Sequence, residues 1–329
     1  MGGNMDFSGM QVLVTGGAGF IGSHLVRRLV GLGAEVAVTV KYGSIIDNVR
    51  LAPVWDSISA READLRNFDS LRQFDGESFD CIFHLAAYNH VGASFLHVNE
   101  ALQSNLVATA NLMETVTDFG RFVYMSSSES YGYQEQVPFA EEAMPYPISP
   151  YAVGKYAGEC YARMKRHQTD ADIVCVRPFN TFGPYQSERA VIPELIIRCL
   201  RGLTVETTEG RQTREFNYVD NIVDGLLAAA SVAPAPSELI NIGAQEEIAI
   251  RDLVVKIHEL TGSDSELKIG ALPDRPTEIW RMSAANERAK DLLGWTPVVD
   301  FEEGLRRTVE WYRSFLALYH AEGTALSGL

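Results

Sequence analysis

The sequence of 329 residues lacks the features that mark membrane and nucleic-acid-binding proteins. It has no uninterrupted apolar run long enough to span a bilayer, and residues 1–10 lack the basic-then-apolar order of a secretory signal. Basic residues are few, since 28 Lys and Arg face 43 Asp and Glu for a formal net charge of -15. An acidic chain is poorly suited to phosphate backbones and anionic lipids. We therefore expect no nucleic-acid partner and no membrane attachment.

Cysteine is also scarce, and the four residues lie far apart without a CxxC pair: Cys81, Cys160, Cys175 and Cys199. This spacing favours neither a disulfide framework nor a zinc site. The seven histidines form no HxxxH or similar metal-binding pattern. We expect buried free thiols, a reducing cytoplasmic location and no metal ion.

Strand-like and helix-like segments alternate through the first half of the chain. Short β-rich runs are expected at 11–15, 35–40, 79–85, 121–125 and 173–177, and helical periodicity occurs at 21–30, 98–116 and 151–167. A strand end and a short helix are expected within 64–74. Alternation of this kind requires right-handed crossovers and builds a parallel sheet covered by helices on both faces. The sequence therefore predicts a doubly wound α/β fold.

The pattern is less regular after residue 180. Helices are expected at 191–200, 219–230, 250–260 and 301–318, strands at 205–208 and 239–242, and a Pro- and Ala-rich connector at 233–236. We predict a dinucleotide-binding domain over 1–179, to which a strand near 216–245 returns. Residues 180–329 mainly form a smaller C-terminal α/β domain for the substrate.

A glycine-rich loop follows the first predicted strand. Gly16, Gly19 and Gly22 give the spacing GxxGxxG between that strand and the helix that starts near residue 21. Gly16 permits the tight turn, Gly19 lets a pyrophosphate approach the backbone, and Gly22 lets helix and strand pack closely. The free N–H groups at the helix N-terminus favour an anion. We predict a dinucleotide site here.

The second predicted strand bears on the choice of cofactor. An acidic residue at its end would bind the adenosine ribose, but this strand ends Thr39-Val40-Lys41-Tyr42. Lys41 could instead meet a 2′-phosphate, which favours NADP over NAD, or it could be a solvated surface lysine. Asp64, which ends a strand-like run, is a candidate for contact with the adenine.

A tyrosine and a lysine four residues apart, Tyr151 and Lys155, share one face of a predicted helix. A neighbouring ammonium group favours the phenolate and is expected to lower the pKa of the tyrosine, so that it acts as a base. A second such pair, Tyr161 and Lys165, lies further along. We favour the first pair because it opens the helix and follows a strand end with a cluster of serines, 126–128.

The motifs together resemble those of the extended short-chain dehydrogenase/reductase family, in which NAD(P)-dependent enzymes with a Rossmann sheet act on nucleotide sugars. The matching segments, in family order, are TGGAGFIGSH from 15, HLAA from 84, MSSSESYG from 125, SPYAVGK from 149, RPFNTFGP from 177, REFNYVDN from 214 and LGWTP from 293. The resemblance covers nearly the whole chain. It implies a nucleotide-diphosphate-sugar substrate and a homodimer packed through helices near 101–117 and 151–167.

The resemblance also assigns residues to roles. It implies that Ser127 acts with Tyr151 and Lys155 in catalysis. The cofactor contacts it implies are Gly16, Gly19, Phe20, Ile21, Gly22, Leu65, Leu85, Ala86, Ala87 and Asn105, besides Lys41, Asp64 and the catalytic pair. The substrate contacts it implies are Asn180, Arg189, Arg214 and Arg275. Arginine is well suited to bidentate contact with phosphate.

Glu129 points to one reaction within the family. The run Ser127-Ser128-Glu129 resembles that of dehydratases and decarboxylases, whereas simple 4-epimerases usually carry small or apolar residues there. Once C4 of the sugar is a ketone, a carboxylate can remove the acidified C5 proton while the C6 hydroxyl leaves. Ser128 stands where hexose dehydratases often carry Asp, so the acid for the leaving hydroxyl is open. We predict a 4,6-dehydratase, with a 4-epimerase, a glucuronate-type decarboxylase and a non-catalytic dinucleotide sensor as alternatives.

Overall fold

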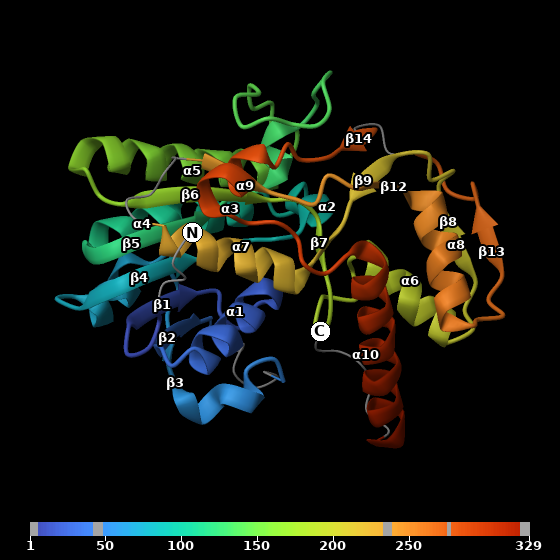
Figure 1. Ribbon diagram of the computed structural model, residues 1–329, viewed down its shortest axis with the longest axis horizontal. Helices are drawn as coiled ribbons and strands as arrows, with labels where there is room; N and C mark the ends of the chain where they lie inside the picture. Colours follow the sequence, from blue (N-terminus) through green and yellow to red (C-terminus); the bar gives the residue numbers. More distant parts are fainter. Residues whose placement is uncertain (1–5, 42–48, 233–238, 275–277, 323–329) are drawn as a thin grey trace.

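A computed structural model describes residues 6–41, 49–232, 239–274 and 278–322. Its central element is a seven-stranded sheet with the order β11-β6-β5-β4-β1-β2-β3 (Figure 1). Every strand pair in this sheet is parallel. The strands are β1 (Gln11–Thr15), β2 (Glu35–Val40), β3 (Ile58–Glu62), β4 (Ser78–His84), β5 (Asp118–Met125), β6 (Ile173–Pro178) and β11 (Leu239–Ile242). The predicted doubly wound parallel sheet is confirmed, including the late strand that returns to it.

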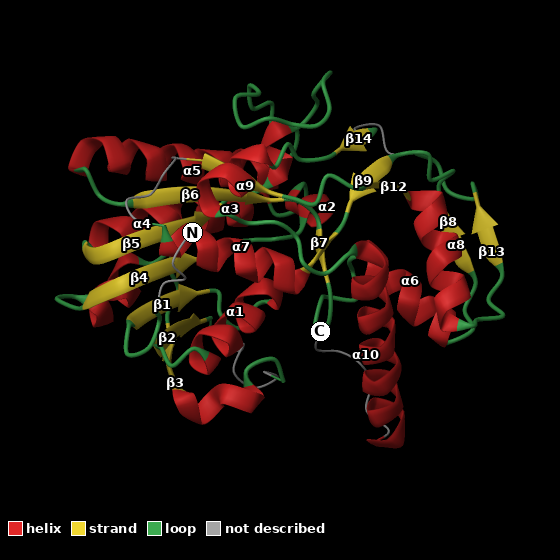
Figure 2. Cartoon of the chain, viewed as in Figure 1, coloured by secondary structure: helices red, strands yellow, loops and turns green. Residues whose placement is uncertain are grey.

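Helices cover both faces of the sheet (Figure 2). Apolar side chains of α1 (Phe20–Gly31), α7 (Val219–Ser231) and α9 (Glu287–Leu293) share one buried cluster with the strands. Those of α4 (Ala108–Thr115), α5 (Pro150–Thr169) and the short helix η2 (Phe68–Phe74) share the cluster on the other face. Apart from the edge strand β3, in which no residue is buried, the strands of this sheet are therefore buried on both sides, which explains their nearly continuous apolar sequences.

The strand order reverses direction at the centre of the sheet. From β1 the chain moves outward to β2 and β3, then returns to the other side of β1 at β4. The connections after β1 and β4 leave the sheet in opposite directions, and such a switch point is where open α/β sheets bind ligands. The segments between β4 and α4 are α2 (Val91–Ser94), α3 (Val98–Leu102) and a π-helical turn, η3 (Gln103–Val107).

The C-terminal part packs around its own apolar cluster, at the right of Figure 1. The helices there are α6 (Val191–Leu200), α8 (Ile250–Thr261) and α10 (Phe301–Glu322). The small sheets use β7 (Thr181–Phe182), β8 (Val205–Thr207), β9 (Thr213–Glu215), β10 (Asn217–Tyr218), β12 (Glu247–Ala249), β13 (Leu267–Ile269) and β14 (Arg281–Met282). Short 3-10 helices, η1 (Ala52–Ser57) and η4 (Ser128–Tyr131), complete the described elements.

Four expectations need correction or fall outside the description. Cys160 is exposed on α5, whereas the other three thiols are buried as expected. The strand expected to reach Asp64 ends at Glu62, because Asp64 turns back to bind its neighbour Arg66. The connector at 233–236 and Arg275 lie outside the described residues. Within the described part of the chain, no helix combines the length and apolarity that a membrane span requires.

Candidate active site

The glycine-rich loop has the close backbone contacts that its spacing predicts. Gly16 has a φ of +70°, and a Cβ on it would lie 2.7 Å from the amide nitrogen of Ala86. A Cβ on Gly22 would lie 2.2 Å from the carbonyl oxygen of Gly16. Both positions therefore exclude any side chain, because real Cβ atoms do not approach backbone atoms this closely.

Gly19 differs from these two glycines. A Cβ there would meet only the carbonyl oxygen of Gly16, at 3.0 Å, and no other described atom within 4 Å. Gly19 is also the N-cap of α1, and no side chain caps that helix end. The first helical N–H groups, at Phe20 and Ile21, thus face open space, where an anionic group can approach. This geometry fits the pyrophosphate of a dinucleotide.

The residues predicted to lie near the adenosine carry paired charges. Lys41 Nζ lies 3.4 Å from Glu100 Oε1, and the lysine side chain is 57% exposed. Asp64 accepts hydrogen bonds from Arg66, which hold the pKa of its carboxyl below the ordinary value. Arg66 also lies 3.9 Å from Glu100. The sequence analysis singled out Lys41 and Asp64 but not Arg66. The separation of only two residues between Asp64 and Arg66 could have indicated their ion pair.

The side chain of Asn105 fixes the segment after β4 through hydrogen bonds to its backbone. Its side-chain oxygen accepts from the Tyr88 amide at 2.7 Å, and its amide nitrogen donates to the Tyr88 and Tyr151 carbonyls at 3.2 and 3.5 Å. Asn105 is 1% exposed and lies in the π-helical turn. It therefore positions the strand end and the catalytic helix, and its side chain is used by protein groups. The predicted direct contact with the cofactor gains no support from this geometry.

The other predicted cofactor contacts flank the same groove. Leu85 is buried, while Ala86 and Ala87 are partly exposed at the end of β4. The Ala86 amide donates to Thr15 Oγ1 at 3.2 Å, which ties the ends of β4 and β1 together. Leu65 is buried, and its carbonyl accepts from Asn111 on α4.

Ser127 and Tyr151 come together at the end of β5. Ser127 caps η4, and its hydroxyl also hydrogen-bonds with the Tyr151 phenol. Tyr151 is the second residue of α5, after Pro150, and Ser149 caps this helix by accepting from the Ala152 amide. The structure therefore brings together the hydroxyls of a predicted catalytic serine and a predicted catalytic tyrosine.

Lys155 corrects one expectation about this pair. Its ammonium donates to the Met125 carbonyl and lies 4.9 Å from the centre of the Tyr124 ring. Burial lowers the pKa of Lys155 to about 7. Burial likewise raises the pKa of Tyr151 to about 12, although its hydrogen bond with Ser127 opposes the shift. In the protein without its cofactor, the lysine therefore does not lower the pKa of the tyrosine as the spacing alone predicts.

The two residues after Ser127 take different directions. Glu129 is partly exposed, and its charge raises the pKa of Tyr151, so it lies near the phenol. Ser128 is 3% exposed, and its hydroxyl donates to the sulfur of Met282 at 3.6 Å. The geometry keeps Glu129 as a candidate acid or base. It does not support Ser128 as the acid for a leaving hydroxyl, because its proton is directed at a buried thioether.

The second tyrosine–lysine pair binds elsewhere. Tyr161 donates to the Glu114 carboxylate on α4, and Lys165 lies 2.9 Å from the same carboxylate. Both side chains therefore fasten α5 to α4. This geometry favours Tyr151 and Lys155 as the catalytic pair.

The predicted substrate residues lie in the C-terminal part and are less gathered. Arg214 forms an ion pair with Glu278 at 2.6 Å, and both side chains are largely buried. Asn180 donates to the Glu215 carbonyl at 3.2 Å. The sequence did not single out Glu278, and its pairing with Arg214 across 64 residues gives no local signal.

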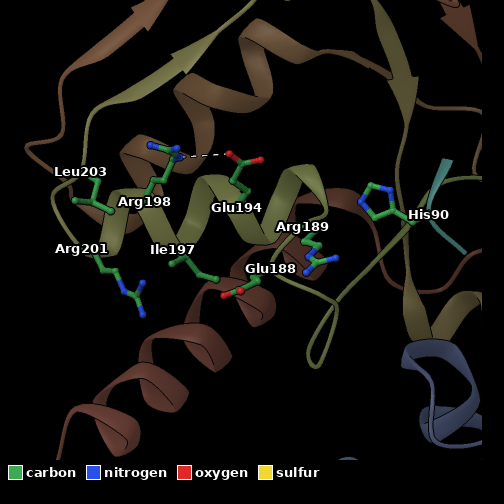
Figure 3. Close-up of a pocket in the computed structure, with 8 residues that line it drawn as sticks. All are labelled: His90, Glu188, Arg189, Glu194, Ile197, Arg198, Arg201 and Leu203. Carbon is green, nitrogen blue, oxygen red and sulfur yellow. Dashed lines mark hydrogen bonds and ion pairs between the residues drawn. The ribbon is translucent and has the colours of Figure 1, made fainter. Parts of the chain in front are cut away.

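Arg189 lines a cavity of about 470 Å³ beside α6 (Figure 3). His90, from the segment after β4, lines the same cavity and lies toward the same end as Arg189 in Figure 3. His90 also accepts a hydrogen bond from the Ala93 amide as the cap of α2. The cavity is therefore lined by residues from both the segment after β4 and the C-terminal part. His90 is a candidate site residue that the sequence analysis did not single out.

The fold and this site define a protein with a Rossmann-type sheet, a serine just after β5, and a tyrosine and a lysine on α5. Comparisons with known proteins agree. Residues 13–308 match the family model described as GDP-mannose 4,6 dehydratase. The chain therefore belongs to the extended short-chain dehydrogenase/reductase family of nucleotide-sugar dehydratases and epimerases, and it is an enzyme with an NAD(P)-binding fold.

Individual relatives carry different activities. A dTDP-D-glucose 4,6-dehydratase from Bos taurus is 31% identical over 94% of this chain and 90% of its own length. A UDP-glucose 4-epimerase from Mycolicibacterium smegmatis is 34% identical over 93% of this chain and 99% of its own. The crystal structure of a dTDP-glucose 4,6-dehydratase from Streptomyces venezuelae, with NAD and TYD bound, matches with a TM-score of 0.85 and 31% identity over 94% and 98% of the two chains.

Proposed function

We propose that this chain is a nucleotide-sugar 4,6-dehydratase, which oxidises C4, eliminates water across C5 and C6, and returns the hydride to C6. The observation that carries this proposal is the position of Glu129, two residues beyond Ser127 and close enough to Tyr151 to raise its pKa. A carboxylate beside the oxidised carbon is the base that the elimination needs. The dehydratase relatives support the same choice.

The first step needs a base for the C4 hydroxyl. Tyr151 takes that proton, and Ser127 hydrogen-bonds the same sugar oxygen through its hydroxyl. NAD(P), held at the glycine-rich loop, supplies the hydride acceptor and later the donor. Lys155 lies close to the site with a pKa lowered to about 7, so its ammonium can release or regain a proton near neutral pH.

The second step removes water. Glu129 takes the C5 proton, which the C4 ketone has made acidic, and the C6 hydroxyl leaves. The departing hydroxyl needs one proton to become water, and Glu129 has just acquired one. A single carboxyl group therefore balances the elimination, which removes the need for Ser128 as a separate acid. When the hydride returns to C6, C5 must regain a proton, and Glu129, protonated again from solvent, would supply it.

The test is Glu129→Gln, which keeps the size of the side chain but cannot accept the proton. Oxidation at C4 should survive, so dTDP-glucose or UDP-glucose should reduce the bound cofactor, and the reaction should stall there. Exchange of the C5 hydrogen with solvent deuterium should be lost. Glu135→Gln, on the exposed loop six residues later, is the control and should behave as wild type. Unchanged product formation and exchange in Glu129→Gln would remove the main support for a dehydratase.

A 4-epimerase is the second candidate, favoured by the relative from Mycolicibacterium smegmatis. It needs only Ser127, Tyr151 and Lys155. The enzyme and its cofactor should be incubated with dTDP-glucose, UDP-glucose, UDP-glucuronate and UDP-N-acetylglucosamine. Loss of water identifies a dehydratase, loss of carbon dioxide a decarboxylase, and unchanged mass with a changed sugar an epimerase. Tight dinucleotide binding without turnover identifies a sensor.

We propose further that residues 180–329 mainly bind the sugar nucleotide through Asn180, Arg189, Arg214 and Arg275. Arg214 and Arg189 supply cations for the diphosphate. For the cofactor we propose NADP, supported by Lys41 and by the lack of an acid in Thr39-Val40-Lys41 at the C-terminal end of β2. Arg66 provides a second cation close to the same place.

A homodimer is also proposed, packed through the helices between α2 and α5. Large apolar side chains are exposed along these helices: Phe95, Leu96, Val98, Val107, Val153 and Met164. Exposed apolar side chains of this number on and between neighbouring helices favour burial against a second copy. Sedimentation velocity should give a dimer, and Val153→Glu with Leu96→Glu should give a monomer. The buried free thiols support a cytoplasmic location.

A further inference from the structure

Glu159 is a buried charge that the proposed reaction does not use. It stands eight residues after Tyr151 and four after Lys155, so the three side chains follow one face of α5. Its side chain is 0% exposed, below the two catalytic groups and away from solvent. A carboxylate in such a place is costly to bury and needs strong partners.

Two elements of the sheet provide those partners. Arg177 on β6 donates to both carboxylate oxygens, at 2.8 and 2.7 Å, in a bidentate pair. Ser126 at the end of β5 donates at 2.7 Å. Arg163 on α5 lies further off, at 3.9 Å. Glu159 therefore ties the catalytic helix to the ends of two neighbouring strands.

The bond to Ser126 has a specific consequence because of its neighbours. Met125 provides the carbonyl that accepts from Lys155, and Ser127 provides the hydroxyl that bonds Tyr151. Both residues adjoin Ser126. Fixing the side chain of Ser126 thus fixes the short piece of backbone from which both catalytic side chains are oriented.

The charge of Glu159 also acts on Lys155. Around this lysine lie His84 from β4, Tyr124 from β5, and Cys175 from β6, besides Glu159 on its own helix. Burial lowers the pKa of Lys155, while Glu159 and Cys175 raise it. Since Cys175 is a buried thiol, Glu159 is the ionised group that opposes the cost of burying the ammonium.

We propose that Glu159 is a positioning residue for C4 oxidation, because it fixes Ser126 between the two catalytic contacts and keeps a negative charge one turn from Lys155. The role rests on the proposed C4 oxidation and applies equally to a dehydratase, an epimerase or a decarboxylase. Glu159 touches neither substrate nor cofactor in this assignment and acts only through Ser126 and Lys155.

The direct test is the titration of Lys155 in the full-length enzyme by NMR. The chain has six lysines, so ¹³Cε-labelled lysine gives six signals, and Lys155→Met identifies one of them. Glu159→Gln should lower the titration midpoint of Lys155 by about one pH unit, because a neighbouring opposite charge is lost. Glu114→Gln is the matched control, since Glu114 binds Lys165 on the same helix. It should move the Lys165 signal and leave Lys155 unchanged.

The second readout is the rate of cofactor reduction after mixing with the nucleotide sugar that the panel identifies. In Glu159→Gln this rate should fall about 10-fold, as expected for one lost hydrogen bond to a charged group, with KM unchanged. Should the variant fail to fold because Arg177 loses its partner, the double variant with Arg177→Met restores neutrality and should show the same lowered midpoint. A folded variant with wild-type midpoint and rate overturns the proposal. Absence of turnover on every sugar with a shifted midpoint overturns the proposed function alone.

Discussion

The cofactor region and the substrate region of this enzyme are built in different ways. Around β1 and β5, the predicted residues owe their positions to backbone contacts between strand ends, as with Gly16 against the Ala86 backbone, or to a neighbouring hydroxyl, as with Ser127 beside Tyr151. In the C-terminal part, Arg214 is already bound by Glu278, a residue 64 positions away. On the proposed assignment, a pyrophosphate at the glycine-rich loop would displace no side chain that caps α1, whereas a diphosphate at Arg214 would have to replace the Glu278 carboxylate.

This contrast indicates how much of the binding free energy each region loses by breaking internal contacts. A cleft made of backbone N–H groups and glycines costs little to occupy, because no internal contact is lost. A diphosphate that takes Arg214 from Glu278 gains a bidentate contact but breaks one of equal kind. We therefore expect substitutions in the cofactor region to abolish activity. Substitutions in the substrate region should only reduce activity by degrees.

The largest effect is expected at Tyr151. Tyr151→Phe removes the base for the C4 hydroxyl, and turnover should fall about 10²–10⁴-fold. Tyr161→Phe removes the same atom from the second pair, where the phenol binds Glu114, and should be nearly silent. Steady-state rates of the two variants measured side by side decide between the pairs. If Tyr151→Phe keeps its activity and Tyr161→Phe is inactive, the catalytic pair is Tyr161 and Lys165, and our assignment on α5 is wrong.

Substitutions in the glycine-rich loop should also have a large effect. Here the effect on cofactor binding can be measured separately from the effect on folding. Gly19→Val places its side chain in open space, so the fold should survive while cofactor affinity falls roughly 100-fold, or about 2.7 kcal/mol. Gly22→Ala instead meets the Gly16 carbonyl and should lower the melting temperature of the protein without cofactor. Calorimetric titration with NAD and NADP, beside thermal unfolding, measures both. Wild-type affinity in Gly19→Val would contradict the assignment of the loop.

Sequence reasoning succeeded where local patterns decide the structure. The parallel sheet, the helix that starts at Pro150 and the late return of Leu239–Ile242 all follow from periodicity and spacing. It failed where partners distant in sequence decide. The direction of Lys155 toward Met125 depends on a strand end 30 residues earlier, and burial, which spacing cannot reveal, sets its pKa. The direction of the Ser128 hydroxyl likewise depends on a distant partner, since Met282 lies 154 residues away.

An intermediate effect on nucleotide binding is expected at Arg214. Substitution of its partner Glu278 should change the affinity in the opposite direction. Arg214→Ala should weaken binding of UDP or dTDP about 10- to 100-fold, as expected for a lost hydrogen bond to a charged group. Glu278→Gln should strengthen binding, because the phosphate then has no carboxylate to displace. Arg211→Ala, on an exposed ion pair nearby, is the control. If Glu278→Gln weakens binding instead, Glu278 contacts the nucleotide itself, and the two regions are built more alike than the contacts indicate.

The smallest effect is expected at Lys41, whose ion pair with Glu100 is exposed to solvent. Lys41→Ala should weaken NADP by only about 0.5–1 kcal/mol and leave NAD unchanged, because solvent screens an exposed pair. Glu100→Gln should act in the opposite sense and tighten NADP, since Glu100 competes with a 2′-phosphate for both Lys41 and Arg66. Lys290→Ala, exposed on α9, controls for the loss of one positive charge. Affinities for both cofactors at two salt concentrations measure the effect, which should shrink at high salt. If wild type prefers NAD and neither variant changes that preference, Lys41 is only a surface cation, and the cofactor region owes its selectivity to backbone geometry throughout.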